Sequence, residues 1–311
     1  MKKELVKRYE NNPILTKDDI PYPVETVHNA GVVKYNGRYM MLFRSHLANG
    51  RSIIGIAESD DGFNFKARQQ PFMAPAKEGA FAEYEAFGVE DARVVFLEGA
   101  YYITYSAYSA HGVRIGLAKT TDFELVERVA LITQADHRNT VLFGEKIDGR
   151  YVRLDRPHSD INPWSIWISY SPDLIHWGDS KVVMKPAKYH WDEMKIGPGA
   201  PPVRTDKGWL NIYHGAFQTM AGAVYRLGAA LHKLDDPAVV LGASDRWILE
   251  PADAWERTGY VPNVVFCCGA VAEEDGTVKL YWGGADTVMC AGTAVIEQLV
   301  ELCLTGGREP L

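Results

Sequence analysis

The sequence predicts an all-β fold, a five-bladed β-propeller, and two repeated features support that prediction. A polar turn that contains glycine, followed by an alternating strand rich in aromatic residues, occurs five times in the 311 residues. A short apolar run precedes each turn and another strand follows, which is the pattern of strands joined by hairpins. The five turn-and-strand segments are 35–45, 97–107, 147–157, 206–216 and 274–284.

The long period of this repeat separates a propeller from other all-β folds. The turn glycines Gly37, Gly99, Gly149, Gly208 and Gly276 are 50 to 68 residues apart. Such a period, with about four strands in each unit, is typical of propeller blades, whereas a β-sandwich has fewer strands and no long-period repeat. A generic all-β protein whose hairpins resemble one another by chance is the alternative.

Each unit is expected to have strands on both sides of its turn segment. Similar turns at 60–65, 120–125 and 171–177 follow the third strand of three units and predict a fourth, outer strand. The whole chain, 1–311, is expected to be one domain, with residues 1–25 as an arm or closing strand and a short amphipathic helix at about 295–304. The flanking strands are expected, in chain order, at 31–35 and 53–59, 93–97 and 113–120, 141–147 and 165–172, 201–205 and 225–232, and 269–274 and 292–297.

Composition limits the classes of function. The net charge of −7 and the pI of about 5.7 argue against a nucleic-acid partner, because binding a phosphate backbone requires a basic surface. The charged first residues contain no secretory signal, and no run of about 18 apolar residues predicts a membrane span. A cytoplasmic protein without a membrane partner is therefore expected. Cys267, Cys268, Cys290 and Cys303 lack metal-ligand spacing and are expected to be reduced core thiols.

Polar residues at the entrances of the innermost strands are the candidate functional residues. In a propeller these strands line the central channel, so their entrances converge on one axial pocket. One charged residue at a strand end is usually a solvated rim residue, but here such residues recur at matching places in several units. Two carboxylates with several arginines and a lysine suit an anionic ligand beside a general acid. The candidates before the apolar runs are His28, Asn29, Glu90, Asp91, Arg93, Asp136, His137, Arg138 and Lys195, and those at second-strand ends are Arg44, Arg156, His158, His214 and Asp286.

Three of these residues are expected to form an oxyanion clamp. Arg138 and Arg156 lie at matching levels of one unit, and Lys195 opens the next unit. Arginine offers a planar fork to phosphate, and lysine acts as a point charge. No metal is expected, because His, Asp and Glu show no ligand spacing, and no nucleotide cofactor, because no glycine-rich phosphate loop follows a strand.

Several ordered motifs, spread over most of the chain, resemble glycoside hydrolase family 130, the mannoside phosphorylases. They are GVEDARVV (88–95), HRNTVLFGEKIDGRYVRLDRP (137–157), SIWISYSPDLIHWGD (165–179), KIGPGAPPV (195–203), NIYHGA (211–216) and YWGGADT (281–287). The resemblance implies a reversible, inverting phosphorolysis in which inorganic phosphate, as co-substrate, attacks a β-mannoside and α-mannose 1-phosphate is released. It places the catalytic acid at Asp91, which would protonate the 3-hydroxyl of the mannosyl ring, and this hydroxyl would pass a proton to the glycosidic oxygen.

The resemblance also implies roles for the other candidates. It assigns phosphate binding to Arg138, Arg156, Lys195 and His214, and binding of the mannosyl ring to Asn29, Arg51, Asp91 and Asp286. Arg44 and Arg93 are expected to contact the substrate or to brace the site. Hydrolytic family members lack the arginine pair, which is present here. An inverting hydrolase needs a second carboxylate to activate water, whereas a phosphorylase needs one acid and a cationic clamp.

Other readings of the sequence stay open at this point. A β-mannosidase would need Glu83, Glu85 or Glu90 as its base, and a non-catalytic propeller would only bind sugars or a protein partner. The β-1,4 linkage is favoured over β-1,2, although the acceptor loops cannot be read from the sequence. Alanine at the third position of the EDAR motif and Asp155 beside Arg156 depart from the common family pattern, and Asp155 is expected to orient that guanidinium or to alter the acceptor site. A homo-oligomer built on the arm and the C-terminal helix is also open.

Overall fold

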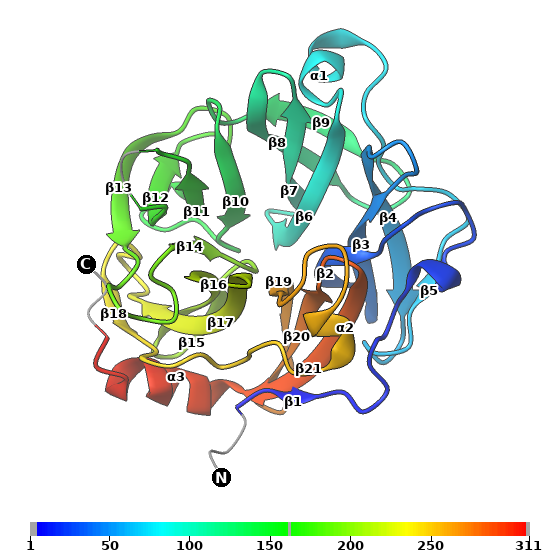
Figure 1. The fold of residues 1–311 in the computed structure, drawn as a ribbon. Helices are drawn as coiled ribbons and strands as arrows, with labels where there is room; N and C mark the ends of the chain where they lie inside the picture. The colour runs from blue at the N-terminus through cyan, green and yellow to red at the C-terminus, as the bar shows by residue number, and fades with distance from the viewer. Residues whose placement is uncertain (1–4, 161–162, 309–311) are drawn as a thin grey trace.

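The computed structural model describes residues 5–160 and 163–308, and this part of the chain is nearly all β-structure. It contains twenty-one strands, three short α-helices and one 3-10 turn, η1 (Lys17–Asp19). Figure 1 shows the strands in groups arranged around a common centre, with the first strand of each group on the inside. The predicted all-β class is therefore confirmed.

The first two groups form one eight-stranded sheet, joined by a single parallel bridge between Ser52 and Gly88. Elsewhere in this sheet neighbouring strands are antiparallel and follow chain order. The first group comprises β2 (His28–Tyr35), β3 (Arg38–His46), β4 (Ser52–Ser59) and β5 (Lys66–Ala67), and the second β6 (Gly88–Leu97), β7 (Ala100–Ser109), β8 (Gly112–Thr120) and β9 (Glu127–Leu131). Helix α1 (Gly79–Tyr84) lies in the connection between them.

Three further sheets complete the arrangement in Figure 1. The third group contains β10 (His137–Leu142), β11 (Tyr151–Pro157), β12 (Ile166–Ser171) and β13 (Gly178–Met184). The fourth group contains β14 (Lys195–Pro198), β15 (Val203–Thr205), β16 (Gly208–Thr219), β17 (Gly222–His232) and β18 (Val240–Ala243). The last group contains β19 (Val265–Ala272), β20 (Thr277–Gly284), β21 (Val288–Val295) and β1 (Lys7–Arg8). Helix α2 (Ala254–Arg257) precedes the last group, and α3 (Ile296–Thr305) follows it.

The expected repeat corresponds to these groups. Each of the five predicted turns joins two successive strands of one group. In four of these turns the glycine, Gly37, Gly99, Gly149 or Gly276, has a φ between 72° and 85°, a conformation that favours glycine. Strands β5, β9 and β13 follow the three similar turns, as expected for outer strands. The last group takes its outer strand, β1, from the start of the chain.

Glycines in the third strands make room for aromatic side chains of the second strands. Phe43 pairs with Gly55, Tyr105 with Gly116, and Tyr213 with Gly228. A Cβ atom built on Gly116 would lie 2.1 Å from the Tyr105 ring, and the other two glycines are similarly close to their aromatic partners. Close packing of this kind explains why glycine occupies the middle of these strands despite its weak strand preference.

Buried apolar residues fill the spaces between neighbouring groups, as where Leu42 and Ile54 of the first group pack with Val94 of the second. The four cysteines are buried and unpaired, and burial raises the pKa of Cys267 and of Cys303 to about 12. No helix within the described residues is both long and apolar enough to cross a membrane.

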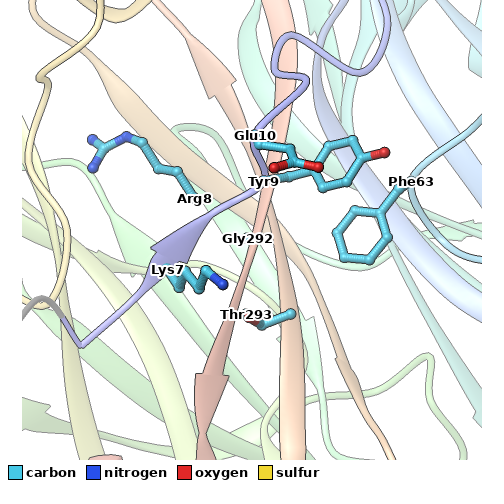
Figure 2. A pocket seen from close by; sticks show the side chains of 7 residues that line it. All are labelled: Lys7, Arg8, Tyr9, Glu10, Phe63, Gly292 and Thr293. Atoms are coloured by element: carbon cyan, nitrogen blue, oxygen red, sulfur yellow. The ribbon is translucent and has the colours of Figure 1, made fainter.

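Strand β1 brings the start of the chain beside its last strand. Lys7 pairs with Thr293 and Arg8 with Gly292, and a surface pocket of about 230 Å³ lies beside this pairing (Figure 2). Phe63 borders this pocket. The pairing therefore links the last group to the residues that precede the first.

Candidate active site

Three innermost strands carry the same irregularity at the same level. The strand register shifts between His28 and Gly31, between Glu90 and Arg93, and between Arg138 and Val141. Each shift is a β-bulge, which re-aims a side chain out of the regular alternation of the strand.

Each bulge contains one residue with left-handed backbone. Asn29 has φ 51°, Asp91 φ 53° and Asn139 φ 59°. Asn and Asp tolerate this conformation better than most residues, because their short polar side chains bond locally. All three side chains line one pocket of about 320 Å³.

This pocket gathers seven of the ten residues for which the family resemblance predicts a role. Its wall combines carboxylates, cations and aromatic rings, contributed by all five groups of strands and their connecting loops. The lining residues are Asn29, Arg44, Asp91, Arg138, Asn139, Arg156, His158, Trp164, Lys195, Tyr225, Val261, Val264, Phe266 and Asp286.

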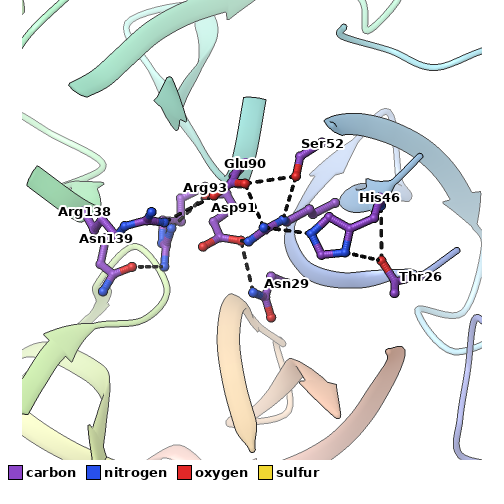
Figure 3. A network of polar contacts seen from close by, with 10 residues as sticks. Thr26, Asn29, His46, Ser52, Glu90, Asp91, Arg93, Arg138 and Asn139 are labelled. Carbon is purple, nitrogen blue, oxygen red and sulfur yellow. Dashed lines mark hydrogen bonds and ion pairs between the residues drawn. The ribbon is translucent and has the colours of Figure 1, made fainter. Parts of the chain in front are cut away.

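Asp91 is held on one side of the pocket by neutral and cationic donors (Figure 3). Its Oδ1 accepts hydrogen bonds from Asn29 Nδ2 at 3.0 Å and from Arg44 Nη1 at 3.1 Å. Burial raises the pKa of Asp91, but the charges of Arg44 and Arg93 outweigh burial and hold this pKa below its usual value. The carboxylate is therefore ionised at neutral pH in this arrangement.

Glu90, next to Asp91 in the sequence, has both carboxylate oxygens occupied. Oε1 accepts from Arg44 Nη2 at 2.7 Å and from Ser52 Oγ at 2.9 Å, and Oε2 accepts from Arg138 Nη1 at 3.2 Å (Figure 3). Glu90 is buried and does not line the pocket.

The other two glutamates considered as a base for water are placed elsewhere. Glu85 is fully buried, with Arg128 Nη2 2.8 Å from its Oε2 and the Tyr105 hydroxyl 2.6 Å from its Oε1. Glu83 is exposed and pairs with His111 at 3.1 Å. Neither glutamate lines the pocket, so neither stands ready to activate a water molecule there.

The pocket that Asp91 lines also holds a cluster of cations with little neutralising charge. Arg156 is buried, donates from Nη1 to His214 Nε2 at 3.0 Å, and has no partner for its Nε among the described residues. Lys195 Nζ lies 4.7 Å from the centre of the Trp164 ring and 5.1 Å from that of Tyr225. No ion pair with a carboxylate of the described chain involves Arg156 or Lys195, whereas Arg138 pairs with Glu90.

Burial and, to a smaller extent, repulsion by neighbouring cations lower the pKa values of Lys195 and Arg156. Burial lowers the pKa of Lys195 to about 8, and the charges of Arg156 and Arg138 add to this effect. Burial also lowers the pKa of Arg156 to about 10, against an opposing contribution from Tyr225 and with repulsion from Arg138. Such a cluster is stabilised by a bound anion.

The pKa of Asp286 is raised, whereas those of Lys195 and Arg156 are lowered. Burial raises its pKa to about 6; Arg44 opposes this, and the charges of Asp91 and Glu90 add to it. It lines the same pocket and also has left-handed backbone, with φ 50°. Its carboxyl group therefore changes from protonated to ionised as the pH rises through about 6.

The other three of these ten residues lie outside the pocket lining. Arg93 is buried behind it and donates to the Asp91 backbone oxygen at 2.7 Å and to Asn139 Oδ1 at 3.3 Å. His214 is buried behind Arg156, and burial and the Arg156 charge lower its pKa well below the usual value, so it is neutral. Arg51 stacks over the Phe87 ring at 4.5 Å.

The expectation that Asp155 orients Arg156 is wrong. Asp155 is buried and pairs instead with Arg153, whose Nη2 lies 3.1 Å from Asp155 Oδ2. The side chains of successive strand residues point to opposite faces of the sheet, so two residues adjacent in sequence do not place their side chains together. Arg156 is instead contacted by His214, which comes from a different group of strands.

Sequence reasoning missed Asn139, Tyr225 and Phe266 in the pocket wall. For Asn139 a signal was available, because it follows Arg138 as Asp91 follows Glu90 and as Asn29 follows His28. Tyr225 and Phe266 sit in ordinary apolar strand patterns and carry no such signal. Among the described residues no group of three or more His, Cys, Asp or Glu side chains is placed to hold a metal ion.

Comparison with known proteins agrees with this geometry. A family profile described as beta-1,4-mannooligosaccharide phosphorylase matches residues 3–305. The 1,2-beta-oligomannan phosphorylase of Thermoanaerobacter sp. (strain X514) is 37% identical, over 94% of this chain and 97% of that protein. The beta-1,4-mannooligosaccharide phosphorylase of Ruminococcus albus is 31% identical, over 96% and 91%.

A solved structure shows the same fold. The beta-1,2-mannobiose phosphorylase of Listeria innocua, in complex with beta-1,2-mannobiose, matches with a TM-score of 0.89 and 32% identity, over 96% of this chain and 99% of that one. With the family profile covering nearly every residue and these relatives matching end to end, the chain belongs to glycoside hydrolase family 130 and is an enzyme of its mannoside phosphorylase class.

Proposed function

We propose that the protein catalyses the reversible, inverting phosphorolysis of β-mannosides, with inorganic phosphate as nucleophile and α-mannose 1-phosphate as product. The observation that carries this proposal is the pair of cations Arg156 and Lys195, which face the pocket of Asp91 without a carboxylate partner in the described chain. A phosphate dianion would neutralise both cations, whereas a water nucleophile would leave their repulsion in place.

The residues divide into two sides of one reaction centre. Arg138, Arg156 and Lys195 hold phosphate, with neutral His214 supporting Arg156 from behind. Asp91 is the acid, and it must gain a proton before it acts, because its arginine neighbours favour the ionised form. A phosphate dianion in the clamp opposes those arginines and thereby raises the pKa of Asp91.

Polar groups around the acid suit the mannosyl ring. Asn29 and Asp286 line the pocket beside Asp91, and Asp286 can donate or accept a hydrogen bond near neutral pH. Trp164, Tyr225 and Phe266 supply apolar and aromatic surface of the kind that packs against sugar rings. Arg44 and Arg93 brace Asp91, and Arg51 is assigned to the outer part of the substrate site.

We also infer that the five groups of strands are the five blades of one propeller domain formed by residues 1–311. Their arrangement around a centre supports this inference, as does the way β1 completes the last group (Figure 1). A cytoplasmic location and a homo-oligomeric state stay predictions.

The linkage is the finer part of the proposal. The sequence-based preference for β-1,4 mannosides stays a prediction, and relatives named for β-1,2 and for β-1,4 substrates both match over more than nine-tenths of the chain. Both linkages therefore belong in the first assay. Incubation of α-mannose 1-phosphate with mannose and with mannobioses, followed by linkage analysis of the products, identifies the acceptor and the bond formed.

The test of the reaction class is the dependence on phosphate. The protein is incubated with β-1,4- and β-1,2-mannobiose, with and without phosphate, and α-mannose 1-phosphate is measured. We expect this product only when phosphate is present. Release of free mannose at the same rate without phosphate would support the hydrolase instead, and no turnover in either direction would support the sugar-binding propeller.

Arg156→Ala tests the clamp directly. Loss of a charged hydrogen-bond donor typically weakens an interaction by about 1.5–3 kcal/mol, so we expect the KM for phosphate to rise about 10- to 100-fold. Arg204→Ala is the matched control, because Arg204 is about half exposed and pairs with Glu145 on the surface. An unchanged KM for phosphate in Arg156→Ala would contradict the clamp.

A further inference from the structure

Glu90 connects the two sides of the site through two arginines. Arg44 donates from Nη2 to Glu90 Oε1 at 2.7 Å and from Nη1 to Asp91 Oδ1 at 3.1 Å. Arg138 donates to Glu90 Oε2 at 3.2 Å and also lines the pocket beside the clamp. A continuous chain of charged hydrogen bonds therefore runs from Arg138, through Glu90 and Arg44, to Asp91.

The two arginine contacts of Glu90 are unequal. The contact with Arg138 is the longer one, and the Arg138 side chain is 26% exposed against 13% for Arg44. A phosphate in the clamp would compete with Glu90 for Arg138, because a dianion attracts a guanidinium more strongly than one carboxylate does. Glu90 would then direct its charge toward Arg44 alone.

A stronger contact between Glu90 and Arg44 weakens the hold of Arg44 on Asp91. Arg44 is shared between the two carboxylates, so a gain for one is a loss for the other. Asp91 would then take up a proton more readily. The acid would become protonated when the nucleophile is in place, and not before.

We propose that Glu90 is a positioning residue that couples the phosphate site to the acid Asp91 by sharing its charge between Arg138 and Arg44. This inference rests on the proposed function and adds an order of events to it. The coupling is reciprocal, because any group whose protonation is favoured by phosphate must favour phosphate binding when it is protonated.

Other charged and titratable groups near Asp91 also affect its pKa, so the test must separate the effect of Glu90 from theirs. His28 and His46 are held neutral by burial and by Arg44, which lowers both pKa values. The charged and titratable neighbours from all packed elements are His28, Arg44, His46, Arg93, Arg156, His214, Cys268 and Asp286. Substitution of Glu90 leaves every one of these side chains in place.

The experiment compares wild type with Glu90→Gln by two measurements. Calorimetric titration with inorganic phosphate alone measures binding, and kcat as a function of pH, at saturating phosphate and mannobiose, measures the acid. In Glu90→Gln we expect phosphate to bind about threefold to tenfold more tightly, because Arg138 loses its competing carboxylate. We expect kcat at neutral pH to fall about tenfold and its alkaline limb to move about one pH unit lower, because Arg44 then acts on Asp91 alone.

Two further variants keep the inference falsifiable. Glu90→Asp retains the charge, so its alkaline limb should stay near that of wild type. Ser52→Ala removes one neutral donor to Glu90 and the acceptor of the hydrogen bond from Arg44 Nε, but it changes no charge and should therefore leave the limb in place. A purely structural role for Glu90 predicts weaker phosphate binding and a lower kcat at every pH, without movement of the limb, and that result overturns the proposal.

The two levels of inference fail separately. Absence of phosphate-dependent cleavage by the wild-type protein would defeat the proposed function, whatever Glu90 does. Phosphorolysis by wild type together with an unmoved limb in Glu90→Gln would defeat only the coupling. If Glu90→Gln does not fold, as shown by loss of a cooperative thermal transition, Glu90→Asp and Ser52→Ala are compared instead. Movement of the alkaline limb of kcat in Glu90→Asp, which retains the charge, would contradict the coupling.

Discussion

Three pocket residues with left-handed backbone lie in strand bulges, and their identities follow from that conformation. Asn29, Asp91 and Asn139 occupy matching bulges, where most side chains would cost about 1–2 kcal/mol in backbone strain. Asn and Asp reduce that cost and also present a polar group to the pocket. The chemistry of the site and the geometry of the strand therefore select the same residue types.

Asn139 allows the backbone contribution to be measured. Asn139→Ala and Asn139→Gly both remove the hydrogen bond to Arg93, but only glycine adopts a positive φ freely. We expect urea unfolding to show the glycine variant more stable than the alanine variant by about 1 kcal/mol. Equal stabilities would show that the left-handed conformation is not maintained in solution.

Lys195 should make phosphate binding depend on pH. Its pKa is lowered to about 8, so it is charged below that pH and loses its charge as the pH rises through it. We expect the Kd for phosphate, measured by calorimetry, to increase above pH 8. Lys195→Arg keeps its charge to much higher pH and should show a flat profile in the same range. A wild-type profile that is flat up to pH 10 would argue against Lys195 as a phosphate ligand.

At the scale of the element, one turn recurs after the third strand of three groups. Asp61, Asp122 and Asp173 each accept hydrogen bonds from two backbone N–H groups of the following residues. These bonds account for the similarity of the segments 60–65, 120–125 and 171–177. Despite an opposing effect of burial, which is the largest single contribution for Asp61, the pKa of all three carboxylates is lowered.

These turns predict a loss of stability in acid. A carboxylate whose pKa is lower in the folded state than in the unfolded state stabilises the fold at any pH above its unfolded-state pKa, which is about 4. This contribution is lost as the pH falls toward and through the folded-state pKa. We expect the free energy of unfolding to decrease below about pH 4. The variant with Asp61→Asn, Asp122→Asn and Asp173→Asn should show a shallower decrease by denaturant titration between about pH 5 and 2. The same slope in both proteins would assign acid sensitivity to other carboxylates.

On the scale of the whole molecule, both ends of the described chain are tied to residues far away in sequence. Arg8 of β1 donates to Glu256, a fully buried carboxylate, with Nη2 and Oε2 2.8 Å apart. Near the other end, Arg308 Nη2 lies 2.7 Å from the buried Asp192, which precedes the clamp residue Lys195 by three positions. The first ion pair attaches β1 to the segment before the last group, and the second attaches the end of the described chain to the segment that precedes Lys195.

Arg8→Ala tests the ion pair with Glu256. Removal of one partner of a buried ion pair typically costs about 3–5 kcal/mol, because the remaining charge stays buried. We expect a loss near the lower end, since Trp282 Nε1 still donates to Glu256 at 2.9 Å. Lys7→Ala, at the exposed neighbouring position of β1, should change stability by less than about 0.5 kcal/mol. Similar losses in both variants, measured by chemical unfolding, would mean that the ion pair contributes little.

Local sequence patterns were sufficient for the strand repeat and for most of the candidate site. The alternation of apolar residues and the glycine turns are short-range properties, so the positions of strands such as β3, β7 and β20 could be predicted. Seven of the ten predicted site residues line one pocket because matching positions in repeated units meet at the centre.

Contacts between distant segments could not be read in this way. Arg156 was expected to be oriented by its sequence neighbour Asp155, but it is contacted by His214 from another sheet. Asp155 pairs with Arg153 instead. The bulges that contain Asp91 and Asn139 arise in the pairing of β6 with β7 and of β10 with β11, and Glu90 lies between arginines of two other strands. Periodicity specifies which face of a strand is buried, but charge sharing across a pocket depends on distances that exist only after the sheets have assembled.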